Sequence, residues 1–422
     1  MKTYPKYKDS GVKWVGKIPD GWNLKRIGTQ FTEVNELNSD YKYKTAFKFN
    51  YGTIVPKNET GDLTEYKETY IKYSKLKAND IVINGLNLNY DFVSQRVAIV
   101  PYDGIMTSAY LAIRPRKNIN AEYFTYLFKA MDFMKMFHGM GTGIRLTLSF
   151  TELKKQLLLI PTDSEQSSIV SYLDVATAKM DKFVTKKEQE IELLEKLKQR
   201  IIADAVTKGL DPNAEMVPCD IPWIKQIPKG WITMRAKYMF KKEDRPVREE
   251  DGVVTCFRDG EVTLRKNRRT TGFTESLKEI GYQGIRKGDL VIHQMDAFAG
   301  SCGVSDSDGK GSPVLSVCTA KIEGLNNEYY AKIVRLMGLN GYIQSLYRGI
   351  RERSSDFRFE TFGNQLLPIP LKEEQDMIVE YITVKCEKID KLKSGLQQEI
   401  EKVKQYKQRL ISDVVTGQIK VC

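Results

Sequence analysis

A long amphipathic stretch between residues 161 and 208 constrains this chain more than any other feature. Its apolar residues recur at steps of three and four, broken only at Lys187, and charged residues lie on the other faces. This spacing predicts a helix of roughly 40 residues, about 60 Å long at about 1.5 Å per residue. Pro161 precedes it, and Thr162 and Glu165 have the spacing of a capping box. The apolar seam consists of Ile169, Leu173, Ala176, Met180, Phe183, Ile191, Leu194, Leu197, Ile201 and Ala205.

The same stretch occurs again 209 residues later. Pro370, Glu374 and Gln375 repeat the opening of the first copy. A narrow seam on a long helix stays exposed unless another element covers it, so we expect the two helices to bury their seams against each other as a coiled coil. The alternative is two unrelated surface helices. The second seam consists of Ile378, Ile382, Ile389, Leu392, Ile400, Val403, Tyr406, Leu410 and Val414.

The repeat also covers the segments that precede each helix. Residues 14–22 begin with a tryptophan and end in Pro-Asp-Gly-Trp, and residues 223–231 repeat this pattern with Pro-Lys-Gly-Trp. A turn followed by a buried strand at residues 76–83 returns at residues 285–292. Whole domains are therefore duplicated at an offset of 209.

These patterns predict an α+β fold with an internal pseudo-two-fold repeat. Two similar mixed α/β domains are separated by two long antiparallel helices that form a coiled-coil spacer. We expect the domains to cover residues 1–160 and 209–369. The long helices are expected at 161–208 and at 370–422, the latter range including a short tail.

Charge indicates the kind of partner. Lys and Arg outnumber Asp and Glu by 66 to 54, which gives a formal charge of +12. Charges nearly balance within the two helical stretches, so the surplus lies on the domains. A basic surplus of this kind favours a polyanionic partner such as nucleic acid. The alternative is that it serves solubility alone.

Cysteine use and hydropathy bear on the compartment. The six cysteines include no Cys-x-x-Cys pair, which argues against a disulfide framework or a repeated zinc site. No apolar segment has the length of a signal core or a membrane span. We therefore expect a cytoplasmic protein with reduced thiols and no membrane partner.

Candidate DNA-contacting residues lie in polar loops that follow the repeated strands and helices. Arg can bind a guanine edge or a phosphate, and Asn or Gln can pair with adenine, while glycine allows close backbone approach. An ion pair with a neighbouring acid is the alternative for each arginine. Residues 265–269 form the densest cluster and favour phosphate contact. The predicted DNA-contacting residues are Asn87, Asn89, Gln95, Arg96, Thr142, Arg145, Lys266, Arg268, Arg269, Gln294, Arg351 and Arg353.

The sequence contains no recognisable reaction centre. His138 and His293 are the only histidines and lie in different domains, which leaves little for a histidine-based metal site or a Ser-His pair. Neither a phosphate-binding loop nor a Gly-x-Gly-x-x-Gly motif is present, and the chain lacks the Pro-Pro pair of adenine amino-methyltransferases. We therefore predict a binding protein with no catalytic residues, metal or cofactor of its own.

Together, several of these motifs resemble the specificity subunits of type I restriction-modification systems. They are the paired Trp-to-Trp segments, the strand blocks around Asp80 and Asp289, and the Pro-x-x-x-Glu-Gln openings of both helices. The resemblance spans nearly the whole chain. It implies a sequence-specific reader of double-stranded DNA with two target recognition domains, each contacting one half of an asymmetric bipartite site.

The resemblance also implies partners. They are two adenine methyltransferase (modification) subunits and two restriction/translocase subunits, while this subunit has no catalysis of its own. The helices would act as a ruler between half-sites about 34–36 Å apart. Their non-seam faces, including Glu188, Glu192, Lys196, Glu401 and Lys404, are expected to remain available for partners. The alternative function is an interaction scaffold, built on the same coiled-coil spacer, that does not bind DNA.

Overall fold

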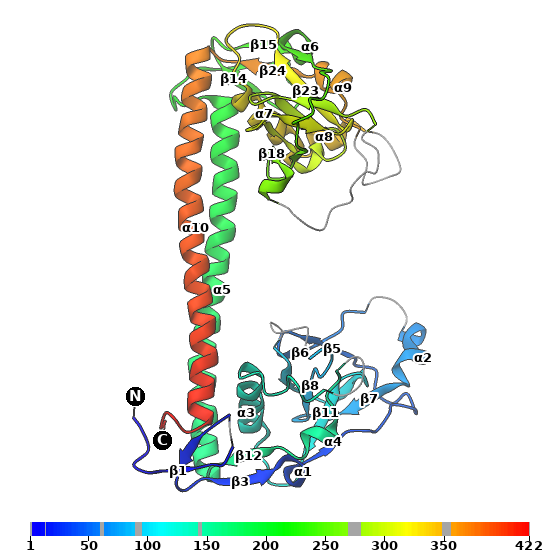
Figure 1. Ribbon diagram of the computed structural model, residues 1–422, viewed down its shortest axis with the longest axis vertical. Helices are drawn as coiled ribbons and strands as arrows, with labels where there is room; N and C mark the ends of the chain where they lie inside the picture. The colour runs from blue at the N-terminus through cyan, green and yellow to red at the C-terminus, as the bar shows by residue number, and fades with distance from the viewer. Residues whose placement is uncertain are drawn as a thin grey trace. The chain divides into compact units, whose positions relative to one another are not determined.

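The chain forms two compact units in the computed structural model (Figure 1). Unit 1 comprises Met1–Glu188 and Gln397–Cys422, and unit 2 comprises Gln189–Leu396, so each long helix is divided between them. Among the described residues, no helix combines the length and apolar character of a membrane span. The structure describes residues 2–12, 14–59, 63–88, 95–141, 146–268, 280–347 and 356–421.

Unit 1 is built around a four-stranded antiparallel sheet with the strand order β4-β11-β8-β9. The central strand β8 consists of three buried β-branched residues, which suits a strand covered on both faces. Helix α3 packs Tyr123, Phe124 and Leu127 into the main core of the unit. The elements are β1 (Tyr7–Asp9), β2 (Lys17–Pro19), β3 (Asn23–Arg26), α1 (Ile27–Gln30), β4 (Phe31–Glu33), β5 (Phe47–Asn50), β6 (Thr53–Pro56), η1 (Leu63–Tyr66), α2 (Lys67–Tyr70), β7 (Tyr73–Leu76), β8 (Ile81–Ile83), β9 (Val97–Ile99), β10 (Gly104–Thr107), β11 (Leu111–Pro115), α3 (Ala121–Phe133), α4 (Phe150–Leu153) and β12 (Leu157–Ile160).

Unit 2 contains a sheet of corresponding order, β16-β23-β20-β21. The strand pairs β1-β2, β3-β12, β5-β6 and β7-β10 of unit 1 also have counterparts, namely β13-β14, β15-β24, β17-β18 and β19-β22. The elements are β13 (Met216–Pro218), β14 (Gln226–Pro228), β15 (Ile232–Arg235), α6 (Ala236–Met239), β16 (Phe240–Lys242), β17 (Val254–Cys256), β18 (Val262–Leu264), η2 (Arg265–Asn267), β19 (Gln283–Ile285), β20 (Leu290–His293), η3 (Ala297–Ala299), β21 (Cys302–Val304), β22 (Gly309–Gly311), β23 (Leu315–Ala320), α7 (Asn327–Leu339), α8 (Tyr342–Ser345), α9 (Phe359–Gly363) and β24 (Leu366–Ile369).

The two predicted long helices are confirmed as α5 (Asp163–Lys208) and α10 (Lys372–Val415). The predicted capping box is present, because Glu165 N–H donates to Thr162 Oγ1 over 3.3 Å and Thr162 N–H donates to Glu165 Oε2 over 3.2 Å. The sequence pattern therefore identified both the start and the length of α5.

Ion pairs join the two helices within each unit. In unit 1, Asp181 pairs with Lys407 at 2.6 Å and Glu188 pairs with Lys404 at 3.4 Å. In unit 2, Lys198 pairs with Asp390 at 2.7 Å. In unit 1, the residue numbers of the α10 partners decrease as those of the α5 residues increase, so the helices run antiparallel there. Glu188 and Lys404 pair with each other but remain 55% and 50% exposed, so their availability to partners stays a prediction.

The seams are only partly buried. Ile169 and Leu173 of α5 and Leu410 and Val414 of α10 belong to the core of unit 1. Four other predicted seam residues remain exposed, which corrects the expectation that the helices bury their whole seams against each other. A straight helix drifts by about 20° per heptad against a strict seven-residue repeat, so residues at the edge of a seam turn outward. These are Phe183 (39% exposed), Leu197 (47%), Leu392 (58%) and Tyr406 (47%).

The first turn of each long helix is fastened to its own domain. Trp22 is buried and donates its indole N–H to Glu165 over 3.4 Å in unit 1. Trp231 donates to Glu374 over 2.9 Å in unit 2. The glutamine that follows each glutamate donates its side-chain N–H to the carbonyl of the proline that precedes the helix. The repeated tryptophan and Glu-Gln motifs therefore meet in space, which accounts for their joint duplication.

The two ends of the chain meet within unit 1. Lys2 forms an isolated β-bridge with Lys420, and Tyr7 donates its hydroxyl proton to the carbonyl of Gly417 over 3.0 Å. Unit 2 has the same succession of long helix and strand, but there residues 209–215 connect α5 to β13 covalently. The terminal contacts of unit 1 thus replace a peptide connection.

Candidate nucleic-acid interface

A buried arginine holds the polar loop that follows β8. Arg96 is fully buried, and its Nη1 donates to the carbonyls of Asn84 and Leu86 over 2.9 and 2.8 Å. Its backbone N–H donates to Asp132 over 2.8 Å, and burial raises the pKa of that carboxyl group. The prediction that Arg96 contacts DNA is therefore corrected, since its guanidinium satisfies loop carbonyls from within the fold.

The surface of this loop carries two other predicted residues. Asn87 is exposed and has a φ of 52°, a left-handed conformation that asparagine tolerates better than most residues. Gln95 is also exposed. Their amide groups are accessible to a ligand, and Arg96 holds the backbone beneath Asn87. That these residues bind DNA stays a prediction.

Arg268 and Lys266 of unit 2 have different surroundings although they lie two residues apart. The Arg268 guanidinium lies 4.2 Å from the centre of the Phe257 ring and pairs with Asp259 and Glu261, each at 2.8 Å. Lys266 is exposed and has no acidic partner among the described residues. Lys266 is therefore the cation that a phosphate can reach without breaking an existing ion pair.

Gln294 supports the loop that follows β20 in unit 2. Its Nε2 donates to the carbonyl of Pro313 over 3.2 Å and to Ser316 Oγ over 3.3 Å. The neighbouring His293 accepts a hydrogen bond from Asp296 N–H, and burial lowers the pKa of its imidazole. Gln294 is half-buried, so reading a base would cost it these two hydrogen bonds.

An equivalent buried aspartate braces the turn before the central strand in each unit. Asp80 accepts two hydrogen bonds from Arg114 of β11, and this pairing raises the pKa of the Arg114 guanidinium. Asp289 instead pairs with Arg245, which follows β16, and the pKa of Arg245 is likewise raised. The sequence repeat revealed the two aspartates but not their partners, because Arg114 lies on β11 whereas Arg245 lies in the loop after β16.

The remaining predicted residues are not placed. Those that lie outside the described part of the chain are Asn89, Thr142, Arg145, Arg269, Arg351 and Arg353.

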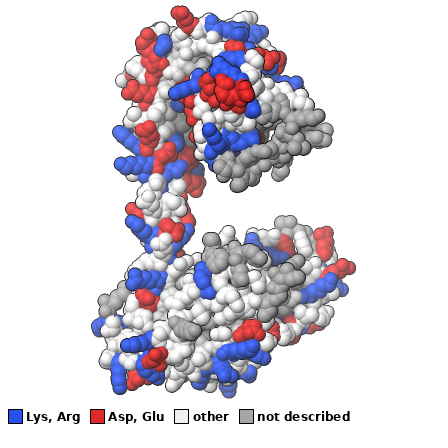
Figure 2. Space-filling view, in the orientation of Figure 1, with Lys and Arg blue, Asp and Glu red and all other residues white. Residues whose placement is uncertain are grey.

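Basic side chains are distributed over both units. Figure 2 shows groups of Lys and Arg on the visible face of each unit, with Asp and Glu between them. Within the described ranges, His, Cys, Asp and Glu form no group of three or more that could hold a metal ion. The described surface thus offers amide and cationic groups in loops that buried side chains support.

Known proteins resemble this chain in sequence and in fold. Residues 19–193 match the type I restriction modification DNA specificity domain. The type I restriction enzyme StySPI specificity subunit of Salmonella potsdam is 24% identical over 209 residues, which are 46% of this chain and 44% of that protein. The matched segment thus spans less than half the length of this relative.

The structural likeness extends over most of the chain. A chain from a study titled "Structural basis underlying complex assembly and conformational transition of the type I R-M system" has a TM-score of 0.68 and 15% identity, covering 95% of this chain and 99% of that one. The HsdS subunit from Thermoanaerobacter tengcongensis has a TM-score of 0.49 and 16% identity, covering 95% and 98%. The chain thus matches the type I restriction modification DNA specificity domain over residues 19–193, and it resembles the specificity subunits of type I restriction-modification systems.

Proposed function

We propose that this chain is the DNA-recognition subunit of a cytoplasmic type I restriction-modification complex. It reads an asymmetric bipartite site in double-stranded DNA, one half with each unit. It positions two adenine methyltransferase subunits and two restriction/translocase subunits on that site, and it contributes no catalytic residue of its own.

The observation that carries this proposal is the combination of a shared framework with different loops. Both units have corresponding strand pairings and a buried aspartate before the central strand. The loop after that strand presents Asn87 in unit 1, whereas Gln294 follows the strand in unit 2. Because base edges are read by side chains, a common framework with different loop residues suits two different half-sites.

The duplication also supports the proposed number of copies of each partner subunit. An element that occurs once in each unit can bind one copy of the same partner in each unit. The equivalent ion pairs Asp181–Lys407 and Asp390–Lys198 show how closely the helical segments of the two units correspond. Two copies of each partner subunit follow from two equivalent sets of surfaces.

Selection from a randomised duplex library tests the proposal. The purified full-length chain, alone and with its methyltransferase partner, should enrich duplexes that share two short defined sequences separated by a gap of fixed length. Binding to unselected duplex should weaken as salt rises, with a slope in log–log form of about −0.9 for each phosphate contacted. A scaffold without DNA contact would show neither enrichment nor salt-dependent retention.

A substitution in unit 1 should then show that each unit reads one half-site. Asn87→Ala should alter base preference in one half and leave the other unchanged, because the other half is read by unit 2. Thr185→Ala, at an exposed position on α5, is the matched control and should enrich the original sequence. Simultaneous change of both halves would contradict one reader per unit.

A further inference from the structure

In each unit, the turn of a two-stranded hairpin lies beside the loop that follows the central strand. In unit 2 the hairpin is β17-β18, and a side chain at Gly303, just after that loop, would collide with the carbonyl of Gly260 in the hairpin turn. In unit 1 the hairpin is β5-β6, and a side chain at Gly52 in its turn would approach within 2.8 Å of Gln95 Oε1. Because the same two segments meet in both units, the hairpin turn belongs to the same surface as the loops proposed to read bases.

An exposed arginine joins the two segments in unit 2. The side chain of Arg258, in the turn between β17 and β18, is 66% exposed, and its Nη2 donates to Asp296 Oδ1 over 2.9 Å. Asp296 lies in the loop after β20, so this bond links the hairpin turn to that loop. Arg258 was not among the predicted DNA-contacting residues, because nothing in the sequence indicates that residue 258 lies beside residue 296.

The backbone is held on both sides of this bond. The backbone N–H of Asp296 donates to His293 Nδ1 over 3.1 Å. Arg335 of α7 donates through Nη1 to the carbonyl of Arg258 over 3.0 Å and also to the carbonyl of Gly300. Arg258 is therefore positioned at its backbone and at its guanidinium, which reduces the conformational entropy that it would lose on binding a ligand.

The bond to Asp296 leaves most of the guanidinium available. It engages a single N–H of Arg258, and the remaining N–H donors suffice for both acceptors of a guanine edge, O6 and N7. Arg268 differs, because its side chain is only 35% exposed and pairs with two acids. Those acids, Asp259 and Glu261, belong to the same turn as Arg258, and their pairing with Arg268 offsets the negative charge that DNA would meet there.

We propose that Arg258 reads a guanine in the major groove, within the half-site of unit 2, and that Asp296 and Arg335 are its positioning residues. This inference rests on the proposed function, because it names a base in the half-site that unit 2 is proposed to read. Guanine fits because it presents two acceptors to a forked donor in the major groove. The pairing with Asp296 lowers the net charge that a phosphate would meet but keeps the directed N–H donors that a base edge requires, which favours the base.

Selection from the randomised duplex library tests this inference with the full-length chain. Arg258→Ala should lower the enrichment of guanine at one position of one half-site by at least about fivefold and leave the other half-site intact. Arg258→Lys keeps the charge but loses the forked geometry, so it should not restore the preference. A preference restored by lysine would indicate a phosphate contact and overturn the proposal. A lower melting temperature of Arg258→Ala with unchanged base preference would overturn it as well.

A single-atom change in the DNA tests the contact itself. 7-Deazaguanine lacks the N7 acceptor and is placed at the guanine that Arg258→Ala no longer selects. The unmodified chain should bind the substituted duplex at least about fivefold more weakly than the original duplex. Arg258→Ala should bind the two duplexes equally. Equal binding of both duplexes by the unmodified chain would overturn the guanine contact.

Asp296→Ala tests the positioning role of this aspartate. The variant should show a weaker preference for the same guanine but no loss of affinity for unselected duplex, because removing an acid does not reduce attraction to phosphates. In the Arg258→Ala background, Asp296→Ala should change the base preference no further, since the two residues act through one contact. Additive effects on the preference would show that Asp296 does not act through Arg258.

Arg335→Met tests the support of the backbone. It removes the donor to the carbonyl of Arg258 and should weaken the preference for the same guanine, measured on the protein that remains folded. A lower melting temperature without any change in base preference would mean that Arg335 stabilises the fold and does not position Arg258.

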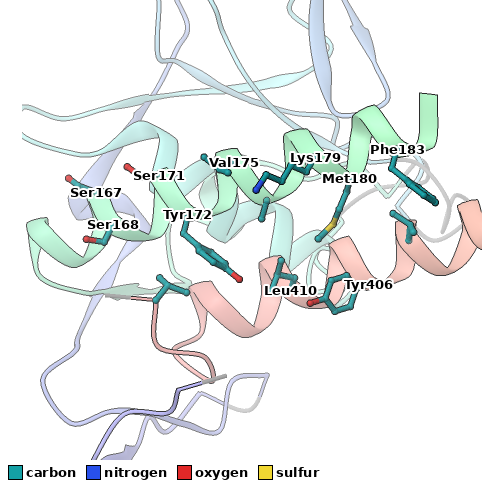
Figure 3. Close-up of a pocket in the computed structure, with 13 residues that line it drawn as sticks. Ser167, Ser168, Ser171, Tyr172, Val175, Lys179, Met180, Phe183, Tyr406 and Leu410 are labelled. Carbon is teal, nitrogen blue, oxygen red and sulfur yellow. The ribbon is translucent and has the colours of Figure 1, made fainter. Parts of the chain in front are cut away.

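Two control variants remove a cation from the long helices. Arg200→Ala removes an exposed arginine of α5 in unit 2 that, like Arg258, pairs with an aspartate, here Asp204 at 3.4 Å. Lys179→Ala removes a lysine that lines the groove between α5 and α10 in unit 1 (Figure 3). Neither residue lies in a domain loop, so both variants should enrich the original half-sites.

The selection also separates this inference from the proposed function. If the unmodified chain enriches a bipartite site and Arg258→Ala selects the same bases, Arg258 is not a reader and the proposed function stands. If the unmodified chain enriches no sequence, the proposed function is wrong and the inference that rests on it is wrong too.

Discussion

The indole N–H of Trp231 donates a hydrogen bond to Glu374 over 2.9 Å. This bond joins the Pro-x-Gly-Trp turn of unit 2 to the first turn of α10, and Trp22 and Glu165 form the corresponding bond in unit 1. Both partners of each bond belong to motifs that recur at an offset of 209. The repeated motifs thus fix where each domain joins its helix.

Removing one partner of this bond should destabilise unit 2. Trp231 is 8% exposed, so Glu374→Ala would leave an indole N–H without its acceptor in a nearly buried place. We expect a loss of about 1–3 kcal/mol in the free energy of unfolding. Chemical denaturation followed by tryptophan fluorescence measures it. Glu373→Ala changes a neighbouring exposed glutamate and is the matched control; equal loss in both variants would mean that the indole bond contributes nothing.

The burial of Arg96 predicts a stability effect that a DNA-contacting arginine would not have. Arg96→Met should leave the carbonyls of Asn84 and Leu86 without their donor, at a cost of about 1–3 kcal/mol for each group that water cannot reach. Thermal unfolding should shift downward. Asn87→Gly, on the surface of the same loop, removes the side chain but keeps the left-handed conformation, so it should change thermal unfolding little and alter DNA preference. An unshifted melting temperature for Arg96→Met would contradict the supporting role of this arginine.

Lys266 and Arg268 should differ in their effects on DNA affinity. Lys266 has no acidic partner in the described ranges. Lys266→Ala should therefore weaken binding to all duplexes alike and reduce the salt slope of that binding by about 1. Arg268 is held by Phe257, Asp259 and Glu261, and phosphate contact would require it to leave them. Arg268→Ala should therefore change the slope less. The reverse order of the two effects would show that Arg268 turns toward DNA.

Periodicity predicted the long helices because spacing and capping are local properties. The capping box of Thr162 and Glu165 is formed as the sequence indicated. The exposure of Phe183 and Tyr406 could not be predicted in the same way. A spacing of three and four residues defines an apolar side of a helix, but not how far around that side the neighbouring helix reaches.

The supporting residues of the loops were harder to predict. Arg96 looks like a DNA-contacting residue in sequence because it lies in a polar loop, and only the convergence of distant carbonyls in three dimensions reveals its burial. Asp80 and Asp289 were visible as a repeated pair, but Arg114 comes from β11 and Arg245 from the loop after β16. Sequence comparison between the copies therefore detects the shared framework, but it misses ion-pair partners that come from non-equivalent positions in the two units.

The contact between the chain ends predicts that a circularly permuted protein folds. Lys2 and Lys420 form a β-bridge in unit 1, where unit 2 has the continuous connection 209–215. A linker of about three residues between positions 421 and 2, together with new ends opened between Leu210 and Asn213, would preserve the contacts of both units. Unit 1 of the permuted protein should melt within about 4 °C of the original, which corresponds to a change of roughly 1–2 kcal/mol for a cooperative unit of about 200 residues. A permutant with the same linker but opened between Ile81 and Val82, inside the buried central strand, should fail to fold. If the first permutant also lost its cooperative transition, the terminal contacts of unit 1 could not substitute for the peptide connection of unit 2.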